Sequence, residues 1–214
     1  DRTFGLTTAG AVYAWGRNNE GVLGDGTTTH RSTPTLVSGG YVWGSISTST
    51  DAHTCGVTTA GAAYCWGTNS YGRLGDGTTS NSTTPVLVSG GHTWASIEGS
   101  NDRTFGLTTA GAVYAWGRNN DGHLGDGTTT HRSTPTLVSG GHTWSSITSD
   151  DHACGVTTAG AAYCWGINNE SSLAGRLGNG STSYSGVPVL VTGGHTWASV
   201  SAGFWHTCGV TTAG

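Results

Sequence analysis

The stretch LTTAGAVYAWGRNNEGVLG at residues 6–24 returns with only two changes at residues 107–125. Looser copies lie at residues 57–75 and 156–178, and Thr-Thr-Ala-Gly returns once more at residues 211–214. The repeat period is therefore about fifty residues, which indicates small units that pack on one another to bury their apolar side chains. Four full units and the start of a fifth have these approximate bounds: 1–51, 52–101, 102–150, 151–204 and 205–214.

Each unit carries four short segments with the composition of strands. In the second unit, residues 55–58 and 62–66 flank a turn, and residues 85–88 and 94–97 follow. The third segment opens on Pro85, which a strand tolerates at its start because little is lost there when an N–H is missing. No segment has the period or the length of a helix. The sequence therefore predicts an all-β protein.

The four strands of a unit cannot shield both faces of their own sheet, so each sheet needs neighbours. Two tryptophans and one tyrosine per unit supply bulk for packing between sheets. We therefore predict β-propeller blades of four antiparallel strands, with four blades plus the start of a fifth.

Composition and charge exclude several classes of protein. The 214 residues include 38 glycines and no methionine, only 9% are charged, and the formal net charge is −4. There is no run of basic residues, which disfavours nucleic acid as a partner. No apolar stretch approaches the roughly 20 residues of a membrane span.

The repeat also has a recognisable order of motifs. Leu-Thr-Thr-x-Gly-x-x-Tyr-x-Trp-Gly-x-Asn-x-x-Gly-x-Leu-Gly is followed by Pro-x-x-Val and by a histidine before the next strand, with the best instances at residues 6–24 and 107–125. This pattern resembles the repeat of the regulator of chromosome condensation family, over the whole chain. The resemblance implies a seven-bladed propeller. For the best-known member it implies nucleotide exchange on a small nuclear GTPase, whereas other members are plant ultraviolet photoreceptors and a secreted bacterial inhibitor of β-lactamase.

The chain departs from that family pattern in its length. Seven blades of this size would need roughly 350 residues. We therefore expect either a segment of a longer protein or separate chains that complete each other's blades. The partners we expect are other copies of the chain or further blades, with a protein or a glycan as a ligand.

Four of the five cysteines occur as pairs ten residues apart around a hairpin turn, Cys55 with Cys65 and Cys154 with Cys164. Residues placed directly opposite on antiparallel strands are close enough for a disulfide. In the first and third units, phenylalanine and alanine replace both cysteines together. Two disulfides are the favoured interpretation, and buried free thiols or zinc ligands are the alternatives. Cys208 would be unpaired or would bond to another chain.

Other polar residues recur at equivalent positions, which favours structural roles. His53, His152 and His206 alternate with Arg2 and Arg103 just before a strand, where a hydrogen bond to the next blade's backbone is expected and a functional ring is the alternative. Three aspartates stand between glycines, which favours turns over calcium binding or catalysis: Asp25, Asp76 and Asp126. The tryptophans favour core packing over stacking on sugars.

The fourth unit departs from the others by a four-residue insertion. It makes residues 170–174 a candidate binding loop, although neutral drift explains it too. The loop residues are Glu170, Ser171, Ser172, Leu173 and Ala174. Candidate glycosylation sites are Asn81, Asn169 and Asn179.

Catalytic motifs are absent from the sequence. There is no Gly-x-Ser-x-Gly elbow, no phosphate-binding loop and no His-Glu-x-x-His, so we expect no catalytic residue, no cofactor and no metal. Disulfides would place the chain outside the cell or on its surface. The leading hypothesis is a non-enzymatic extracellular scaffold of bacterial type, as part of a surface protein or a head-to-tail fibre. The alternative is a secreted protein-binding or inhibitor propeller, and a polysaccharide-acting enzyme or a GTPase exchange factor is the weakest candidate.

Overall fold

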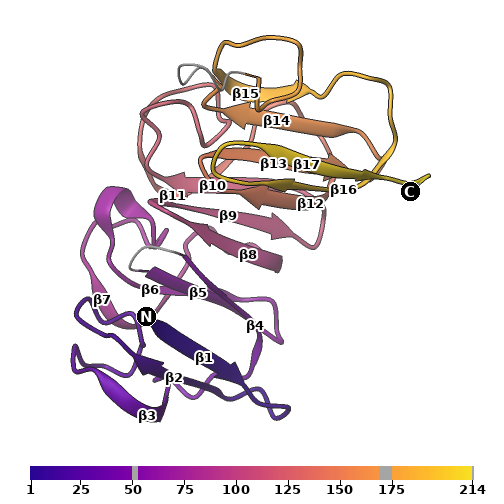
Figure 1. Cartoon of the computed structure of the whole chain (residues 1–214). Helices are drawn as coiled ribbons and strands as arrows, with labels where there is room; N and C mark the ends of the chain where they lie inside the picture. Colours follow the sequence, from indigo (N-terminus) through magenta and orange to yellow (C-terminus); the bar gives the residue numbers. More distant parts are fainter. Residues whose placement is uncertain (50–52, 169–174, 214) are drawn as a thin grey trace.

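The computed structural model describes residues 1–49, 53–168 and 175–213, which form antiparallel sheets in chain order (Figure 1). The first sheet contains β1 (Arg2–Leu6), β2 (Val12–Gly16) and β3 (Arg31–Leu36). The second contains β4 (Trp43–Thr48), β5 (His53–Thr58), β6 (Ala63–Gly67) and β7 (Ser82–Leu87). The third contains β8 (Trp94–Ser100), β9 (Arg103–Thr108), β10 (Val113–Gly117) and β11 (Arg132–Leu137).

The fourth sheet contains β12 (Trp144–Ser149), β13 (His152–Thr157), β14 (Ala162–Gly166) and β15 (Ser185–Leu190). The fifth contains β16 (Trp197–Ala202) and β17 (Thr207–Thr211). The only helical element in the described part of the chain is a short 3-10 turn, η1 (Ser70–Gly72). The predicted all-β fold with blades of four antiparallel strands is therefore confirmed, with three full sheets of four strands among the five.

The sheets are out of phase with the sequence repeat, which corrects the expectation that the four strands of a unit share one sheet. Strand β8, at the end of the second unit, pairs with β9 and begins the third sheet. The backbone N–H of Trp94 donates to the carbonyl of Gly61, which holds the start of β8 against the hairpin turn of the second sheet. The inner strand of the second to fifth sheets therefore comes from the preceding repeat, and strand pairing bridges the boundaries between repeats.

The outermost strand of each four-stranded sheet contains the proline. Pro85 is the fourth residue of β7, so the expected position at the strand start is wrong by three residues. Because β7 has a neighbour on one side only, the missing N–H of Pro85 faces away from the ladder and costs little.

The Trp-Gly tryptophans lie at a β-bulge between the third and fourth strands of their sheets. Between β6 and β7 the register shifts at Trp66, which has no partner there, and β10 shifts at the equivalent Trp116. Because successive side chains of a strand point to opposite faces, Trp66 packs on the first sheet while Cys65 packs on the third.

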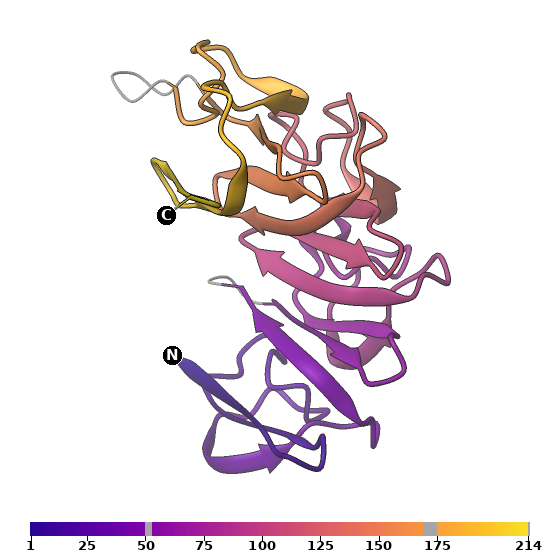
Figure 2. The same ribbon diagram turned by 90° about the vertical axis from the view of Figure 1, so that its right-hand side faces the viewer.

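The sheets stack side by side in a curved row, and the two ends of the chain face the concave side (Figure 2). The core lies between sheets rather than within them. One buried cluster joins Cys55, Cys65 and Leu74 of the second sheet to Trp94 and Trp116 of the third. The equivalent cluster joins the third sheet to the fourth. The sheets therefore bury their faces on one another, as expected for propeller blades.

Candidate functional site

A tryptophan socket joins each full sheet to the sheet before it. We use this name for a backbone carbonyl and the glycine two residues later, in the loop that precedes the outermost strand of a sheet. The indole Nε1 of Trp66 donates to the carbonyl of Val22 at 2.8 Å, and a Cβ on Gly24 would lie 2.6 Å from that nitrogen. Only glycine therefore leaves room for the ring.

The socket is repeated at the next two junctions. Trp116 donates to the carbonyl of Arg73 and Trp165 to that of His123, both at 2.9 Å, and both indoles are fully buried. Because the socket uses a backbone carbonyl, the side chain of the residue that supplies this carbonyl can vary. This explains why Val22 of the first unit can be His123 in its near copy.

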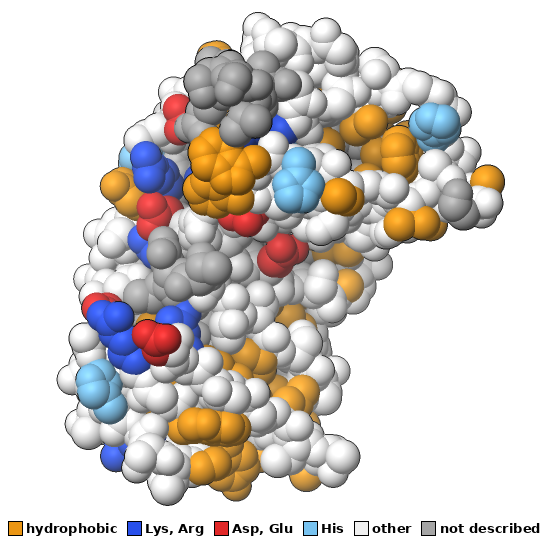
Figure 3. Space-filling view, viewed as in Figure 1, with side chains coloured by type: hydrophobic (Ala, Val, Ile, Leu, Met, Phe, Trp, Pro, Cys, Tyr) orange, Lys and Arg blue, Asp and Glu red, His pale blue; other side chains and the backbone are white. Residues whose placement is uncertain are grey.

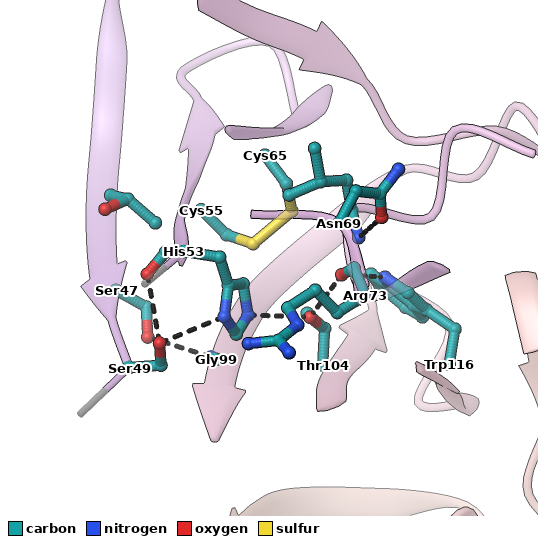
Figure 4. The surroundings of a disulfide bond; sticks show 12 residues. Ser47, Ser49, His53, Cys55, Cys65, Asn69, Arg73, Gly99, Thr104 and Trp116 are labelled. Carbon is teal, nitrogen blue, oxygen red and sulfur yellow. Dashed lines mark hydrogen bonds between the residues drawn. A yellow bond between two sulfur atoms is a disulfide. The ribbon is translucent and has the colours of Figure 1, made fainter. Parts of the chain in front are cut away.

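Two disulfides cross the middle of the second and fourth sheets. Cys55 bonds to Cys65 (Figure 4) and Cys154 to Cys164, with 4.0 Å between the Cα atoms of each pair, and all four side chains are fully buried. In the third sheet, Phe105 lies directly opposite Ala115 in the same register. Cys208 lies on β17, where it is exposed and unbonded.

Arginine and histidine alternate at the start of the second strand of the sheets, and both bond to the following sheet. Arg2 Nη2 donates to the carbonyl of Ser49 and Arg103 Nη1 to that of Asp150, both at 2.7 Å, which is the backbone contact expected from the sequence. The histidines differ from that expectation because they bond to side-chain hydroxyls.

Figure 4 shows His53 between two hydroxyl groups. Its Nε2 lies 3.1 Å from Thr104 Oγ1 of the third sheet, and its Nδ1 lies 2.9 Å from Ser49 Oγ. Burial, followed by the nearby charges of Arg73 and Arg2, lowers the pKa of His53 to about 3. Burial and Arg176 lower the pKa of His152 to about 4, and this ring lies 2.6 Å from Thr207 Oγ1. Both rings are therefore neutral structural links near neutral pH.

A buried asparagine organises the loop that contains each socket. Asn18 Nδ2 donates to the carbonyls of Thr27 and Thr29 and to Asp25 Oδ1, while Asn18 Oδ1 accepts from the N–H of Leu23. The asparagines at the equivalent positions are also fully buried: Asn69, Asn119 and Asn168. This role was not predicted, although the Trp-Gly-x-Asn spacing was the available signal.

The aspartates between glycines are engaged in the same loops. Arg31 Nε donates to Asp25 Oδ2 at 2.6 Å, and Thr27 donates to Oδ1 through both its backbone N–H and its hydroxyl. Burial alone would raise the pKa of Asp25, but these bonds outweigh burial and hold the pKa below its usual value. Asp126 is held in the same way by Arg132 and Thr128. These carboxylates therefore serve the turns.

In the described part of the chain, charged side chains gather toward one end of the sheets, which we call the charged end. It is the end at which β1, β5, β9 and β13 begin and the asparagine loops lie. At the opposite, uncharged end, the Thr-Thr-Ala-Gly and Gly-Gly turns contain no Asp, Glu, Lys or Arg. Figure 3 shows red and blue side chains along the left of the molecule and none along the right edge.

Glu98 of β8 is a half-buried acid that sequence reasoning missed. Its Oε1 accepts a hydrogen bond from the backbone N–H of Ser149 in the fourth sheet at 3.2 Å. Burial raises the pKa of Glu98 to about 7. The negative charge of Asp150 also raises this pKa, and the hydrogen bond from Ser149 lowers it. Its position gave no signal, because Ser47 and Thr148 occupy the equivalent places.

Two of the candidate glycosylation sites lie in the described residues. Asn81 is exposed, and its Oδ1 accepts from the N–H of Asn69 at 2.8 Å. Asn179 is half-buried and its Oδ1 accepts from the N–H of Ser181. Asn169 and the candidate binding loop, residues 170–174, lie outside the described residues.

Residues 1–49, 53–168 and 175–213 contain neither a candidate membrane-spanning helix nor a candidate metal site. No helix in these ranges has the length and apolar character to span a membrane, and no three His, Cys, Asp or Glu side chains gather as a metal site.

The motifs of the loops and hairpins match a known family. The model of the regulator of chromosome condensation (RCC1) repeat matches residues 9–47, 60–107 and 110–156, and a second model of that repeat matches residues 45–73 and 148–171. The chain belongs to the RCC1 repeat family. The family predicted from the sequence is thereby confirmed.

Similar proteins are much longer than this RCC1-repeat chain. Human E3 ubiquitin-protein ligase HERC2 is 38% identical over 86 residues, which are 39% of this chain and 2% of that protein. Human WBSCR16 has a similar structure, with a TM-score of 0.81 at 22% identity over 99% of this chain and 56% of that one. Yeast RCC1 (Prp20), solved with Kap60 bound, has a TM-score of 0.80 at 20% identity over 99% of this chain and 52% of that one. The chain thus spans about half of these solved propellers.

Proposed function

We propose that this chain is a non-enzymatic scaffold that works outside the cell and binds proteins, including repeats of its own kind. The observation that carries the proposal is the pair of disulfides at the centre of alternate sheets. Disulfides persist in oxidising compartments and are rare in the reducing interior of cells. A buried disulfide that replaces a phenylalanine–alanine pair adds a covalent link to a sheet that folds without one elsewhere in the same chain.

The state of the titratable groups supports a scaffold over an enzyme. General acid–base catalysis needs an accessible group whose pKa lies near the working pH. Asp25 and Asp126 are engaged by arginine and threonine, and His53 and His152 are buried with pKa values far below neutral. Glu98 has a pKa near neutral, but its carboxylate bonds to a backbone N–H of the neighbouring sheet. Each of these groups thus has a structural task.

Protein binding is favoured by the fold and by the charge pattern. Yeast RCC1 (Prp20), which has a similar fold, was solved with Kap60 bound to it. In this chain, the charged end presents arginines and carboxylates of both signs, whose arrangement can select a partner of complementary charge.

The proposal is tested by the redox state and the compartment of the chain in the cells that make it. Free thiols are trapped with a membrane-permeant alkylating reagent before lysis, and medium, surface and interior fractions are compared by intact mass. We expect the chain in the medium or at the surface, with one alkyl group, on Cys208. Recovery from the interior with all five cysteines alkylated would overturn the proposal.

A second measurement concerns the partner. The unreduced chain is applied to proteins from the same medium and to a glycan array, with a Cys-to-Ala variant of both disulfides as a control for shape. We expect retention of protein. Binding to a neutral polysaccharide alone, with no protein retained, would contradict the protein-binding part.

A further inference from the structure

The loops that contain the filled sockets differ in one residue at their tips. Each loop lies against the outermost strand of the next sheet, and a glycine permits the close approach, since a Cβ on Gly72 would lie 2.4 Å from the Cα atom of Ser133. Just before this glycine, the first and third units have Glu20 and Asp121, whereas the second unit has Tyr71. The junction between the second and third sheets therefore has an aromatic ring where the other two have a carboxylate.

Tyr71 combines a left-handed backbone with an exposed side chain. Its φ of 62° lies in the region that favours glycine, and a residue with a Cβ adopts it at a cost in free energy. The residue is 40% exposed, and its hydroxyl has no hydrogen bond within residues 1–49, 53–168 and 175–213. Backbone strain beneath an exposed aromatic side chain points to a role at the surface rather than in packing.

Two side chains of the third sheet lie beside this ring. The Cζ atom of Arg118 is 5.8 Å from the centre of the Tyr71 ring, and the imidazole of His131 is 4.8 Å from it, centroid to centroid. We call these three residues the Tyr71 cluster. Because the neighbours already restrict the ring, little further side-chain freedom would be lost when the cluster binds a partner.

The guanidinium of Arg118 is loosely held within the chain. Asp102 accepts a close hydrogen bond from Arg73, whose side chain is almost fully buried. Arg118 Nη1 lies 3.4 Å from the other oxygen of Asp102, and the Arg118 side chain is 38% exposed. One carboxylate thus serves two guanidinium groups, and the exposed guanidinium keeps N–H donors for a ligand.

His131 offers a donor as well. Its Nδ1 accepts a hydrogen bond from the backbone N–H of Asn119 at 3.0 Å, so the neutral imidazole has its proton on Nε2. The residue is exposed, and the described residues provide no acceptor for this proton. The Tyr71 cluster therefore presents a guanidinium, a phenol and an imidazole N–H at one place on the charged end.

The equivalent places at the other two junctions lack this set of donors. The first junction has Glu20, Thr68 and Asn81, and the third junction has Asp121, Ile167 and Tyr184.

We propose that the Tyr71 cluster binds the carboxylates of an acidic segment in a partner protein. A carboxylate is the complement of one guanidinium flanked by two neutral donors, and hydrogen bonds between arginine and carboxylate are among the strongest in proteins. Tyrosine and arginine are also the residues that most often dominate the free energy of protein interfaces. The inference rests on the proposed function only in taking a protein as the ligand.

The test uses the purified, unreduced chain and an end-capped tetraglutamate peptide, with end-capped tetraglutamine as the neutral match. Binding is followed by NMR. We expect one saturable site for tetraglutamate, with shifts of the Arg118 side chain and the His131 ring, and binding of tetraglutamine weaker by roughly tenfold or more. Equal binding of the two peptides, no saturable binding of tetraglutamate, or shifts confined to other residues would overturn the proposal. None of these results bears on the disulfides or the compartment, so a failure here is distinct from a failure of the proposed function.

Variants that copy the first junction test the cluster in a backbone that tolerates them. Arg118→Thr and Tyr71→Glu should each weaken tetraglutamate binding by roughly tenfold or more. His131→Asn should weaken it by about threefold, and it preserves the loop because Asn81 accepts the same backbone hydrogen bond that His131 does. Unchanged binding by Arg118→Thr or by Tyr71→Glu would overturn the proposal.

Two matched controls separate this site from general attraction of charge. Arg17→Gln removes the same charge from the equivalent place in the first unit, and Tyr184→Ala removes another exposed tyrosine. Both should leave tetraglutamate binding within about twofold of the unaltered chain. A loss in Arg17→Gln as large as that in Arg118→Thr would show unspecific attraction and overturn the proposal.

Discussion

The second and fourth sheets solve the same packing problem differently from the third. At the centre of their middle strands, the second and fourth sheets have a disulfide, whereas the third has Phe105 opposite Ala115 in identical register. All six side chains are fully buried. The comparison teaches that the blade geometry does not depend on the disulfide, because one large and one small side chain fill the same space.

The two kinds of sheet also differ at the residue two positions before the first cysteine or the phenylalanine. The disulfide sheets have His53 and His152, while the phenylalanine sheets have Arg2 and Arg103. A buried neutral histidine accompanies each covalent link, and an arginine accompanies each packed pair. The two kinds of sheet should therefore respond differently to acid and to reductant.

The largest expected effect is selective weakening of the disulfide sheets in acid. His53 and His152 bind a proton near pH 6.5 when unfolded but only near pH 3 and 4 when folded. Their stabilisation is present above about pH 6.5 and falls with decreasing pH by roughly 1.4 kcal/mol per unit for each residue. Hydrogen exchange at pH 4.5 should show β5 and β13 opening before β9. Equal protection of all three strands would contradict this.

Next in size is the loss of the aromatic ring in the third sheet. Phe105 packs 6.3 Å from Trp165, centroid to centroid, and no covalent link crosses its sheet. Phe105→Ala should lower the free energy of unfolding by about 3–5 kcal/mol, measured in urea. Phe4→Ala is the matched control and should cost clearly less, because Phe4 is only half-buried. Equal losses would remove the burial argument.

Removal of one disulfide should cost somewhat less. Cys154→Ala combined with Cys164→Ala removes a disulfide that joins residues ten apart in the sequence. The loss of this constraint on the unfolded chain should lower the free energy of unfolding by about 2–3 kcal/mol. Urea unfolding with and without reductant measures it. The midpoint of the double variant should still fall in reductant, because Cys55–Cys65 remains, but by less than that of the unaltered chain. A double variant as stable as the unaltered chain would contradict a stabilising role for the Cys154–Cys164 disulfide.

The smallest effect has the opposite sign and belongs to the third sheet. The pKa of Glu98 is raised from 4.5 to about 7, so the folded state binds the extra proton between these values and loses stability as the pH rises. Glu98→Gln should therefore stabilise the chain at pH 8 by about 1–2 kcal/mol, after allowance for partial exposure, and have little effect at pH 4. Thermal unfolding at both pH values measures it, and destabilisation at pH 8 would sink the assignment.

Local patterns in the sequence were sufficient for the repeat, the strands and the cysteine pairing. The cysteine pairing was readable because Phe105 and Ala115 replace both cysteines together, which is a record of contact. The sheet to which β8 belongs could not be predicted from the sequence, because it depends on the hydrogen bond from the N–H of Trp94 to the carbonyl of Gly61 in the neighbouring sheet. Glu98 and Asn18 were missed for the same kind of reason, since their roles arise from burial against other segments.

The account depends most directly on the seating of one tryptophan from each full sheet in the sheet before it, whether or not a disulfide is present. Hydrogen exchange of the indole N–H groups, followed by NMR with each tryptophan assigned by substitution, tests this. We predict slow exchange for Trp66, Trp116 and Trp165, because each donates to a buried carbonyl, and fast exchange for the exposed Trp205. Fast exchange at Trp66, Trp116 and Trp165 would contradict the account.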